Sequence, residues 1–237
     1  MPTAAAIIIG NEILSGKFAD ENGPWLIQRC RSLGIDLVRV SIIADDIETI
    51  ADEVRRLAGA VDYVFTTGGI GPTHDDLTME GIALAFGVEL RPHPELIAMI
   101  RARMGDAAND AALRMAKVPE GAELWRSDPK RFPVLVCRNV FIFPGVPAYL
   151  QAKFDDIASR LGGEPITSSR LVTEQTETEI AAILHEAAEL WPSVSIGSYP
   201  RFDTKPRTVV VTMDSRTEAD LEACSGWLAS HLSPIPS

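Results

Sequence analysis

Cysteine is scarce in this 237-residue sequence, which contains only Cys30, Cys137 and Cys224. The three are far apart, odd in number and set within apolar segments, so the sequence predicts neither a disulfide framework nor a zinc site. We expect buried thiols in a reducing compartment, and therefore a cytoplasmic protein.

Positive charge is in deficit, because 22 lysines and arginines face 33 aspartates and glutamates, for a formal net charge of −11. Proteins bind a polyanion through a basic face that releases its counterions. The composition therefore argues against nucleic acid and against an anionic membrane as partners.

Long hydrophobic runs are also lacking. The N-terminal stretch MPTAAAIIIG has no basic segment ahead of its apolar residues, and the apolar run is too short to span a bilayer. We expect this stretch to begin the fold rather than to act as a targeting signal.

The sequence does contain a regular alternation of apolar, β-branched runs with helical patterns over its first two-thirds. This alternation indicates an α/β fold in which crossover helices link parallel strands. The expected strands, each apolar enough to be covered on both faces, are Ala4–Ile9, Ile35–Ile43, Asp62–Thr66 and Asn139–Phe143. The expected helices are Asn22–Leu33, Ile47–Ala60, Leu77–Phe86, Pro94–Met104 and Pro147–Leu161.

The pattern changes at GGEP, residues 162–165, which predicts a boundary between a domain at residues 1–163 and a small α+β subdomain at residues 164–237. In the subdomain we expect strands at 166–173, 194–197 and 208–213, and helices at 177–190 and 218–232. Capping boxes are expected at the two helix starts, from Thr176 with Glu179 and from Thr217 with Asp220. The tail SPIPS, residues 233–237, is expected to fray.

Glycines and polar residues follow all four expected strands of the first domain. In an open parallel sheet, ligands bind beyond the carboxyl ends of the strands, because the strand-to-helix loops emerge there. The sequence therefore predicts a ligand site at this edge. Its expected binding residues outside the glycine-rich loop are Gly10, Glu12, Thr67, Pro144 and Gly145.

The glycine-rich loop GGIGPTHDD, residues 68–76, lacks the spacing of both common phosphate motifs, GxxxxGK[ST] and GxGxxG. Gly68, Gly69 and Gly71 nevertheless permit positive φ and a close approach of the backbone to a ligand. Amides ahead of a helix N-terminus bind anions. We expect these glycines, with Thr73, to hold a phosphate or a carboxylate.

Three aspartates in these loops, Asp45, Asp75 and Asp76, would repel a phosphorylated ligand unless a divalent cation lay between them. Mg²⁺ is commonly bound by one or two carboxylates together with substrate phosphate oxygens. We expect Mg²⁺, Mn²⁺ or Co²⁺ to be held by Asp45 and Asp76 and to orient an attacking water. Asp75 has a supporting catalytic role in this hypothesis, as does Glu12.

Simpler roles are open for the same residues. Asp45, with Glu48 three positions later, is spaced to cap the helix that follows, and Asp75 or Asp76 is spaced to cap the next one. His74 suits an exposed loop position. Three arginines follow the spacing of a solvated helix face: Arg101, Arg103 and Arg114.

Five segments resemble, in order, the molybdopterin-binding fold of the MoaB/Mog type, and more closely the N-terminal domain of competence/damage-inducible protein A. They are GNEIL (10–14), ADD (44–46), TTGGIGPTHDDLT (66–78), VPEGAE (118–123) and FPGVP (143–147). Two further segments, RFPVLVCRNVFIFPGVP (131–147) and IGSYPRF (196–202), resemble the molybdopterin-binding-like domain of eukaryotic FAD synthase. The resemblance implies a three-layer α/β sandwich with a mostly parallel sheet, usually assembled as a homo-oligomer.

The resemblance also implies a divalent-metal hydrolase of a dinucleotide pyrophosphate, with FAD or ADP-ribose as the substrate. By position, Asp45 matches the catalytic acid of the ADD turn and Asp76 matches the acid of the glycine-rich loop. The chain departs from the pattern at residues 127–135, where a GTAPG-like stretch is usual. It departs again at LRMAK, residues 113–117, where Met115 replaces a polar amide.

Three functions are consistent with the sequence, each with a small nucleotide or pterin as ligand. The first is metal-dependent hydrolysis of a nucleotide pyrophosphate of the FAD or ADP-ribose type. The second is binding or adenylylation of molybdopterin in the same phosphate pocket. The third is a non-catalytic nucleotide-binding module, which the altered LRMAK segment favours.

Overall fold

The structure is a computed structural model that describes residues 2–235. The chain divides into two compact units, residues 1–163 and residues 164–237, each with a hydrophobic core of its own.

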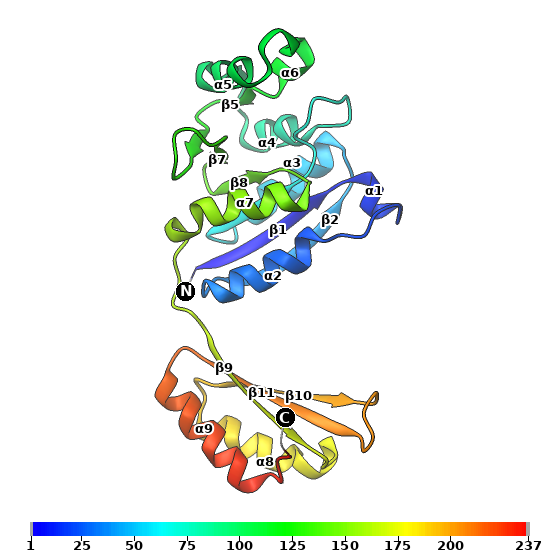
Figure 1. Ribbon diagram of the computed structural model, residues 1–237, viewed down its shortest axis with the longest axis vertical. Coiled ribbons are helices and arrows are strands. Elements are labelled where there is room, and N and C mark those ends of the chain that lie inside the picture. Colours follow the sequence, from blue (N-terminus) through cyan, green and yellow to red (C-terminus); the bar gives the residue numbers. More distant parts are fainter. Residues whose placement is uncertain (1, 236–237) are drawn as a thin grey trace. The chain divides into compact units, whose positions relative to one another are not determined.

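A six-stranded sheet forms the centre of the first unit, in the strand order β2-β1-β3-β8-β7-β6 (Figure 1). Its first four members are parallel: β2 (Asp36–Ile43), β1 (Thr3–Ile9), β3 (Tyr63–Thr67) and β8 (Val140–Phe143). The last two, β7 (Val134–Cys137) and β6 (Glu123–Trp125), run antiparallel to their neighbours. The prediction of a mostly parallel sheet is confirmed.

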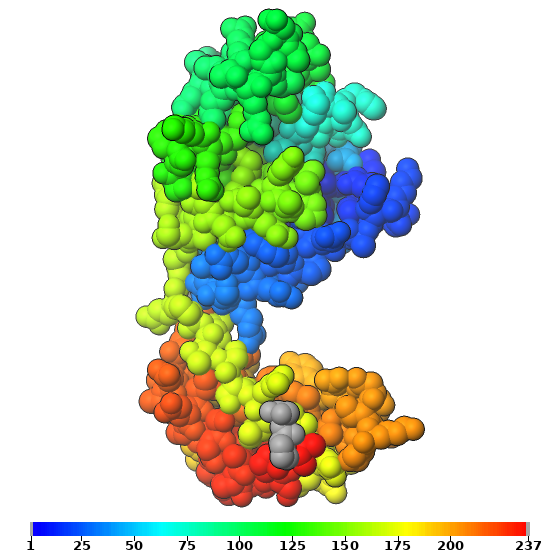
Figure 2. Space-filling view, in the orientation of Figure 1, coloured from blue at the N-terminus to red at the C-terminus, as the bar shows by residue number. Residues whose placement is uncertain are grey.

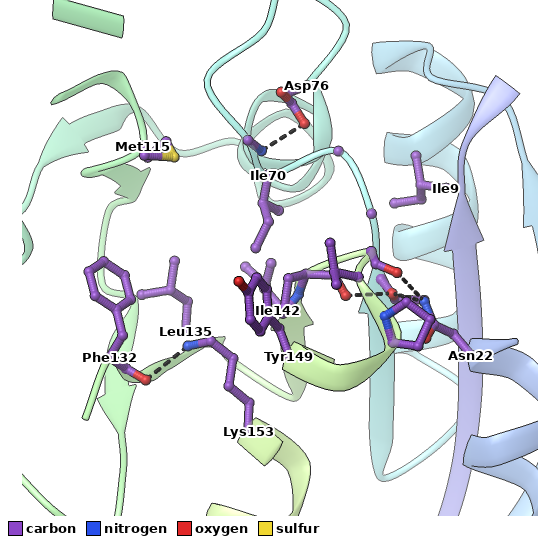
Figure 3. Close-up of a pocket in the computed structure, with 18 of the residues that line it drawn as sticks. Ile9, Asn22, Ile70, Asp76, Met115, Phe132, Leu135, Ile142, Tyr149 and Lys153 are labelled. Atoms are coloured by element: carbon purple, nitrogen blue, oxygen red, sulfur yellow. Dashed lines mark hydrogen bonds between the residues drawn. The ribbon is translucent and has the colours of Figure 1, made fainter. Parts of the chain in front are cut away.

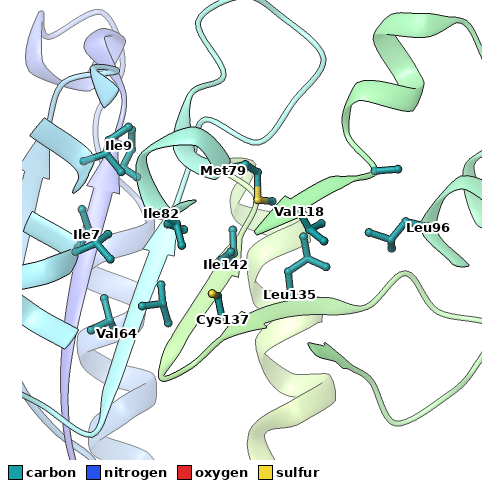
Figure 4. Close-up of a cluster of buried hydrophobic side chains, with 14 of the residues drawn as sticks. Ile7, Ile9, Val64, Met79, Ile82, Leu96, Val118, Leu135, Cys137 and Ile142 are labelled. Carbon is teal, nitrogen blue, oxygen red and sulfur yellow. The ribbon is translucent and has the colours of Figure 1, made fainter. Parts of the chain in front are cut away.

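Helices cover both faces of this sheet, which confirms the three-layer arrangement. On one face α3 (Ile47–Ala58) and α4 (Thr78–Phe86) pack against alternate residues of β1, including Ile7 and Ile9 (Figure 4). On the other face lie α2 (Asn22–Ser32) and α7 (Pro147–Ile157), which is extended by a 3-10 turn at Ala158–Arg160. The period of two along β1 thus sends successive side chains into two separate cores.

An insertion between α4 and β6 adds a small two-stranded layer that the sequence did not predict, apart from its longest helix. It comprises β4 (Leu90–Pro92), α5 (Pro94–Met104), a 3-10 turn (Gly105–Ala107), α6 (Asp110–Arg114) and β5 (Lys117–Pro119). Leu96 and Ile100 of α5 and Val118 of β5 extend the core on the α4 side (Figure 4). The insertion therefore builds one wall above the end of the sheet where the loops meet.

The expectation that the strand at Ile35–Ile43 is covered on both faces is wrong. β2 lies at the edge of the sheet, and Val38, Val40 and Ile42 are 56%, 37% and 42% exposed. A bulge interrupts its pairing with β1 between Ala4 and Ala5. β-branched residues suit edge strands as well as central ones, so composition alone does not separate the two.

The short helix α1 (Asn11–Leu14) and the turn after it form a projection of the first unit, seen in dark blue in Figure 2. Leu14 and Phe18 are 53% and 67% exposed there. The segment therefore presents apolar side chains next to the predicted ligand site.

The second unit is an antiparallel three-stranded sheet in the order β10-β11-β9 with two helices. Its elements are β9 (Thr167–Thr173), α8 (Glu177–Leu190), β10 (Ser195–Arg201), β11 (Thr208–Ser215) and α9 (Glu218–His231). Both helices and all three strands match the expected order, although β10 continues four residues beyond the expected strand. Ile180, Val211 and Leu228 are fully buried in its core.

The two expected capping boxes have different outcomes. At α8, Glu179 accepts hydrogen bonds from the amide of Thr176 at 2.7 Å and from its hydroxyl at 2.8 Å, which confirms the capping box. At α9 the expectation is wrong, because Asp220 instead accepts from the Ser193 hydroxyl at 2.6 Å.

The expected fraying of the tail is also wrong as far as residue 235. The Ser233 amide donates to Gln175 at 2.9 Å, and the Ile235 amide donates to the Val172 carbonyl at 2.8 Å. Residues 236 and 237 lie outside the described residues.

The three cysteines are buried and unpaired, as predicted. Burial raises the pKa of the Cys30 thiol to about 12, so it is inert as a nucleophile at neutral pH. Within residues 2–235, no helix combines the length and apolar composition needed to cross a membrane.

Candidate active site

The loop between β3 and α4 requires glycine at its first two positions. Gly68 has φ of +101°, and a Cβ there would lie 2.1 Å from the Ile9 carbonyl oxygen. Gly69 has φ of +61°, and a Cβ there would lie 2.5 Å from the Thr78 hydroxyl oxygen. That hydroxyl donates to the Gly68 carbonyl at 2.8 Å. The start of α4 is thus packed directly on the loop.

Asp76 closes the same loop upon itself. Its Oδ1 accepts from the Gly71 amide at 2.7 Å (Figure 3), and its Oδ2 accepts from the Thr73 amide at 2.7 Å and from the Thr73 hydroxyl at 2.6 Å. The alternative in which Asp76 or Asp75 caps α4 is wrong, since the N-cap residue is Leu77 and the helix has no side-chain cap. Asp76 orders the loop rather than the helix.

Asp75 faces the same threonine. Its Oδ1 lies 2.6 Å from the Thr73 hydroxyl oxygen, whose single proton it shares with Asp76, and this hydrogen bond is the main cause of the lowered pKa of Asp75. The His74 side chain is almost fully exposed, as expected for a surface loop residue. Its ring nitrogen lies 4.0 Å from the Asp75 carboxylate.

Several amides in the loop already have a hydrogen-bond partner. The Gly68 amide donates to the Phe143 carbonyl at 3.3 Å, and those of Gly71 and Thr73 donate to Asp76. Among the described residues, the amides of Gly69 and Ile70 have no hydrogen-bond partner. The His74 amide also has none, but Gly69 and Ile70 line the cavity described below and His74 does not, so their N–H groups are the ones placed for an anion there.

The turn after β2 separates the roles of two adjacent aspartates. Asp46 is the N-cap of α3 and accepts from the Thr49 amide at 2.9 Å, which shows that the capping alternative for Asp45 is wrong. Asp45 instead accepts from the Asn11 amide at 2.7 Å. Its carboxylate is therefore tied to the turn after β1, on the side of the sheet edge where the other loops lie.

Electrostatics show that the predicted acidic residues share one region. Partial burial is the main cause that raises the pKa of Asp45, and the negative charges of Glu12, Asp75 and Asp76 raise it further, against the lowering effect of the Asn11 amide. The Glu12 carboxylate lies against Gly10, where a Cβ would be 2.5 Å from its Oε1. Three separate turns thus contribute acids to the same rim.

Asn22, at the start of α2, is a site residue that the sequence did not reveal. Its buried amide donates to the Thr67 hydroxyl at 3.0 Å and to the Gly145 carbonyl at 2.7 Å, and Thr67 in turn donates to the Pro144 carbonyl at 2.9 Å. One side chain therefore holds the end of β3 to the loop before α7. Its position just after the polar turn at residues 20–21 was the only available signal.

A cavity of about 1130 Å³ opens beside these loops (Figure 3). Eight of the predicted site residues line it: Glu12, Thr67, Gly68, Gly69, Gly71, Asp76, Pro144 and Gly145. Four others, among the described residues, lie outside its lining: Gly10, Asp45, Thr73 and Asp75. Much of the remaining wall is apolar, with Ile70, Met115 and Ile142 among its members.

One arginine departs from the expected solvated face. Arg114 of α6 donates to the Thr73 carbonyl at 2.6 Å, so the insertion is fastened to the glycine-rich loop. Arg103 of α5 lines the cavity, whereas Arg101 does not.

The acidic rim offers hard oxygen ligands but no complete cage for a metal. Within residues 2–235, no group of three or more His, Cys, Asp and Glu side chains is placed to hold an ion together. Asp45 uses one oxygen for Asn11 and keeps the other free. This donor set fits Mg²⁺ or Mn²⁺, which take most of their ligands from water and substrate phosphates. Metal binding by Asp45 and Asp76 stays a prediction.

Comparison with known proteins covers both units. Residues 5–163 match the family described as probable molybdopterin binding domain, and residues 165–235 match the FAD synthase middle domain. The chain is 34% identical to a protein of Archaeoglobus fulgidus over 89% of each chain, and 32% identical to a probable FAD synthase of Caenorhabditis elegans over 93% of this chain and 48% of that protein.

A solved structure supports the same assignment for the first unit. The crystal structure of the protein CinA from Thermoplasma acidophilum superposes with a TM-score of 0.62 at 30% identity, and the match covers 68% of this chain and 98% of that one. The chain therefore belongs to the molybdopterin-binding family of the MoaB/Mog type, as a CinA-like member whose second unit matches the FAD synthase middle domain.

Proposed function

We propose that the protein hydrolyses the pyrophosphate bond of a nucleotide of the FAD or ADP-ribose type, with a divalent metal. The observation that carries the proposal is that the negative charges of Glu12 and Asp76 act on Asp45, beside a loop in which the Gly69 and Ile70 amides have no partner among the described residues. Carboxylates alone would repel a phosphate. Free amides alone would bind a phosphate but could not promote its hydrolysis. Together they suit a phosphate that arrives with a cation.

The amides of Gly69 and Ile70 bind the phosphate oxygens in this proposal. Backbone N–H groups fixed ahead of a helix are suited to this task, because they need no reorganisation when charge builds up on the oxygens. Asp76 keeps the loop in the required shape through its bonds to Gly71 and Thr73. Phosphate binding therefore depends on the ordered conformation of this loop.

Asp45 accepts the proton of the attacking water. A carboxylate with a raised pKa is a better base than an ordinary one, and its second oxygen is free for this role while Asn11 fixes the first. As the new P–O bond forms, the bond from phosphorus to the bridging oxygen breaks, and two monophosphates result. A divalent metal held by Asp76 and by the Asp45 oxygen that accepts from Asn11 would neutralise the phosphate charge beside these acids and would leave the other Asp45 oxygen for the proton.

The second unit supports a flavin nucleotide as one substrate, since it matches the FAD synthase middle domain. The cavity supports a bulky ligand, because a volume of about 1130 Å³ exceeds what a pyrophosphate alone requires. ADP-ribose has the same pyrophosphate and is the matched test substrate.

Hydrolysis of FAD and of ADP-ribose with Mg²⁺, Mn²⁺ or Co²⁺ tests the proposal, by chromatography of the AMP released. The expected result is metal-dependent AMP release that Asp76→Ala abolishes. Release by Asp76→Ala at the wild-type rate would refute the assignment. Binding of either nucleotide without release under any metal would support the non-catalytic module instead.

A second candidate, binding or adenylylation of molybdopterin, is favoured by the match of residues 5–163 to the probable molybdopterin binding domain. The free amides and the acidic rim serve that reaction equally well. Formation of an adenylylated pterin from ATP and molybdopterin, in the absence of FAD hydrolysis, would select it.

A further inference from the structure

Lys153 of α7 places an ammonium group inside the cavity. Its Nζ donates to the Phe132 carbonyl at 2.9 Å (Figure 3). It also donates to the Pro133 carbonyl at 2.5 Å. An ammonium has three N–H groups. Since the described residues provide two partners, one N–H is left for a ligand.

The surroundings of this ammonium are mainly apolar. Phe132 lies with its ring centroid 5.2 Å from Nζ, and the buried side chains of Leu135 and Ile142 line the same part of the cavity (Figure 3). Tyr149, one helical turn before Lys153, adds a second aromatic ring to the lining. Flat apolar walls of this kind suit the faces of a planar ring.

A purely structural role accounts for only part of this arrangement. The loop before β7 is already fastened to α7 by Asp156, which accepts from the Ser127 amide at 3.0 Å, from the Ser127 hydroxyl and from Arg131 at 3.3 Å. Removing a lysine from water costs free energy. A second fastening by a half-buried ammonium that keeps one donor free is better explained by a ligand.

We propose that Lys153 binds the heterocyclic ring of the substrate, with its free N–H donated to a carbonyl oxygen of the ring and with the ring faces against Phe132 and its apolar neighbours. The inference rests on the proposed function for the other half of the ligand, the pyrophosphate at Gly69 and Ile70. It names the ligand class as a flat, carbonyl-bearing heterocycle such as a flavin. Lys153 is then a specificity residue rather than part of the hydrolytic group.

The alternative role for Lys153 is to bind a phosphate of the ligand. Lys130 and Arg131, on the loop beside Lys153, also line the cavity and are exposed. A phosphate would be drawn to these solvated cations, whereas Lys153 has Phe132 and Leu135 around it and two carbonyl oxygens already bound. Competition by inorganic pyrophosphate distinguishes the two.

Riboflavin, which has the ring but no phosphate, is the direct probe. Its dissociation constant is measured by quenching of flavin fluorescence on the wild type, Lys153→Met and Ser127→Ala. Methionine keeps the unbranched stem and removes the ammonium. Ser127 does not itself line the cavity, and the serine variant loosens the same loop by removing the hydroxyl's hydrogen bond to Asp156. We expect Lys153→Met to bind riboflavin roughly tenfold more weakly, the equivalent of about 1.4 kcal/mol, and Ser127→Ala to bind it as the wild type does.

Three results would overturn the inference: no riboflavin binding by the wild type, equal binding by folded Lys153→Met, or an equal loss in Ser127→Ala. Displacement of riboflavin by inorganic pyrophosphate in the wild type but not in Lys130→Met would also overturn it. Kinetics separate it from the proposed function, because Lys153→Met should raise KM for FAD and leave KM for ADP-ribose unchanged. A wild type that binds riboflavin and hydrolyses neither nucleotide would refute only the proposed function.

Titration of the wild type keeps the inference testable if Lys153→Met does not fold. Burial lowers the pKa of Lys153 to about 8, against the opposing charge of Asp156. Riboflavin affinity should therefore fall as the pH rises through 8, because the ammonium loses its charge. The other charged side chains that line the cavity are Arg131, Lys130, Arg103, Glu12, Asp20, Glu21 and Asp76. Lys130→Met should keep the wild-type profile, and a flat wild-type profile would contradict the inference.

Discussion

The Asp45 carboxylate accepts a hydrogen bond from the Asn11 amide at 2.7 Å, which joins the turn after β2 to the turn after β1. Its neighbour Asp46 instead caps α3. Two adjacent aspartates thus have separate roles. Substituting each in turn allows the effects on activity and on stability to be compared.

Substitution at the two aspartates should separate activity from stability. We expect Asp45→Asn to lower hydrolysis of FAD or ADP-ribose at least about 100-fold, because the acceptor of the water's proton is lost while the Asn11 contact is retained. Asp46→Ala should cost about 1 kcal/mol of unfolding free energy through loss of the cap, with hydrolysis unchanged. Initial rates and urea unfolding of both variants check this. Equal losses of activity in the two variants would contradict a specific role of Asp45 and would show that activity depends only on the structure of the turn.

Stability should depend on pH at Asp45 in a defined direction. The folded protein holds the Asp45 proton more tightly than the unfolded chain, because its pKa is raised above the ordinary 3.8. The stability gained from this proton is complete below 3.8 and is lost as the pH rises through the folded pKa. Asp45→Asn should therefore raise Tm at pH 7, and the gain should disappear near pH 3. A lower Tm for the variant at pH 7 would contradict the electrostatic account.

Asp76 should control the order of the glycine-rich loop. Asn at this position has one acceptor oxygen in place of two, so it cannot serve the Gly71 and Thr73 amides in the same way. We expect Asp76→Asn to raise hydrogen exchange of the peptide spanning residues 68–77 and to reduce nucleotide hydrolysis. Thr73→Val keeps both amide contacts and should raise exchange less. Unchanged exchange in Asp76→Asn would show that the loop holds its shape without this side chain.

Gly68 should be the least replaceable glycine of the site. Alanine there adds the cost of positive φ to an overlap with the Ile9 carbonyl oxygen, so we expect a loss of more than about 3 kcal/mol. Gly87 also has positive φ, but a Cβ there meets no atom within 4 Å, and Gly87→Ala should cost only about 1–2 kcal/mol. Chemical unfolding of both variants measures the difference. Similar losses of unfolding free energy in the two variants would mean that the positive φ alone, and not the overlap with Ile9, sets the cost.

Periodicity and composition predicted the four parallel strands, their helices and the second unit with its order of elements. They missed β4–β7, and three of these strands, β4, β5 and β6, have only three residues each. A three-residue strand is defined by its partner rather than by its own pattern. The exposure of β2 was missed for a related reason, since strand order in the sheet is a long-range property.

The site was predicted at the level of loops and less well at the level of atoms. Which of Asp45 and Asp46 caps α3 depends on backbone angles that the shared residue type does not encode. Asn22 and Lys153 act through partners more than 20 residues away or on another element, at Gly145 and Phe132. Local spacing carries no information about such contacts.

The open edge of β2 has a consequence for how copies of the chain meet. Among residues 2–235 no strand pairs with its outer side, and Val38, Val40 and Ile42 expose apolar side chains along this edge. Borders of this kind recruit further strands unless charge or a bulge blocks them. The bulge near Ala5 protects only the first half. At high protein concentration, association between copies of the chain should therefore begin along residues 40–43. This part of β2 has no role in the proposed reaction.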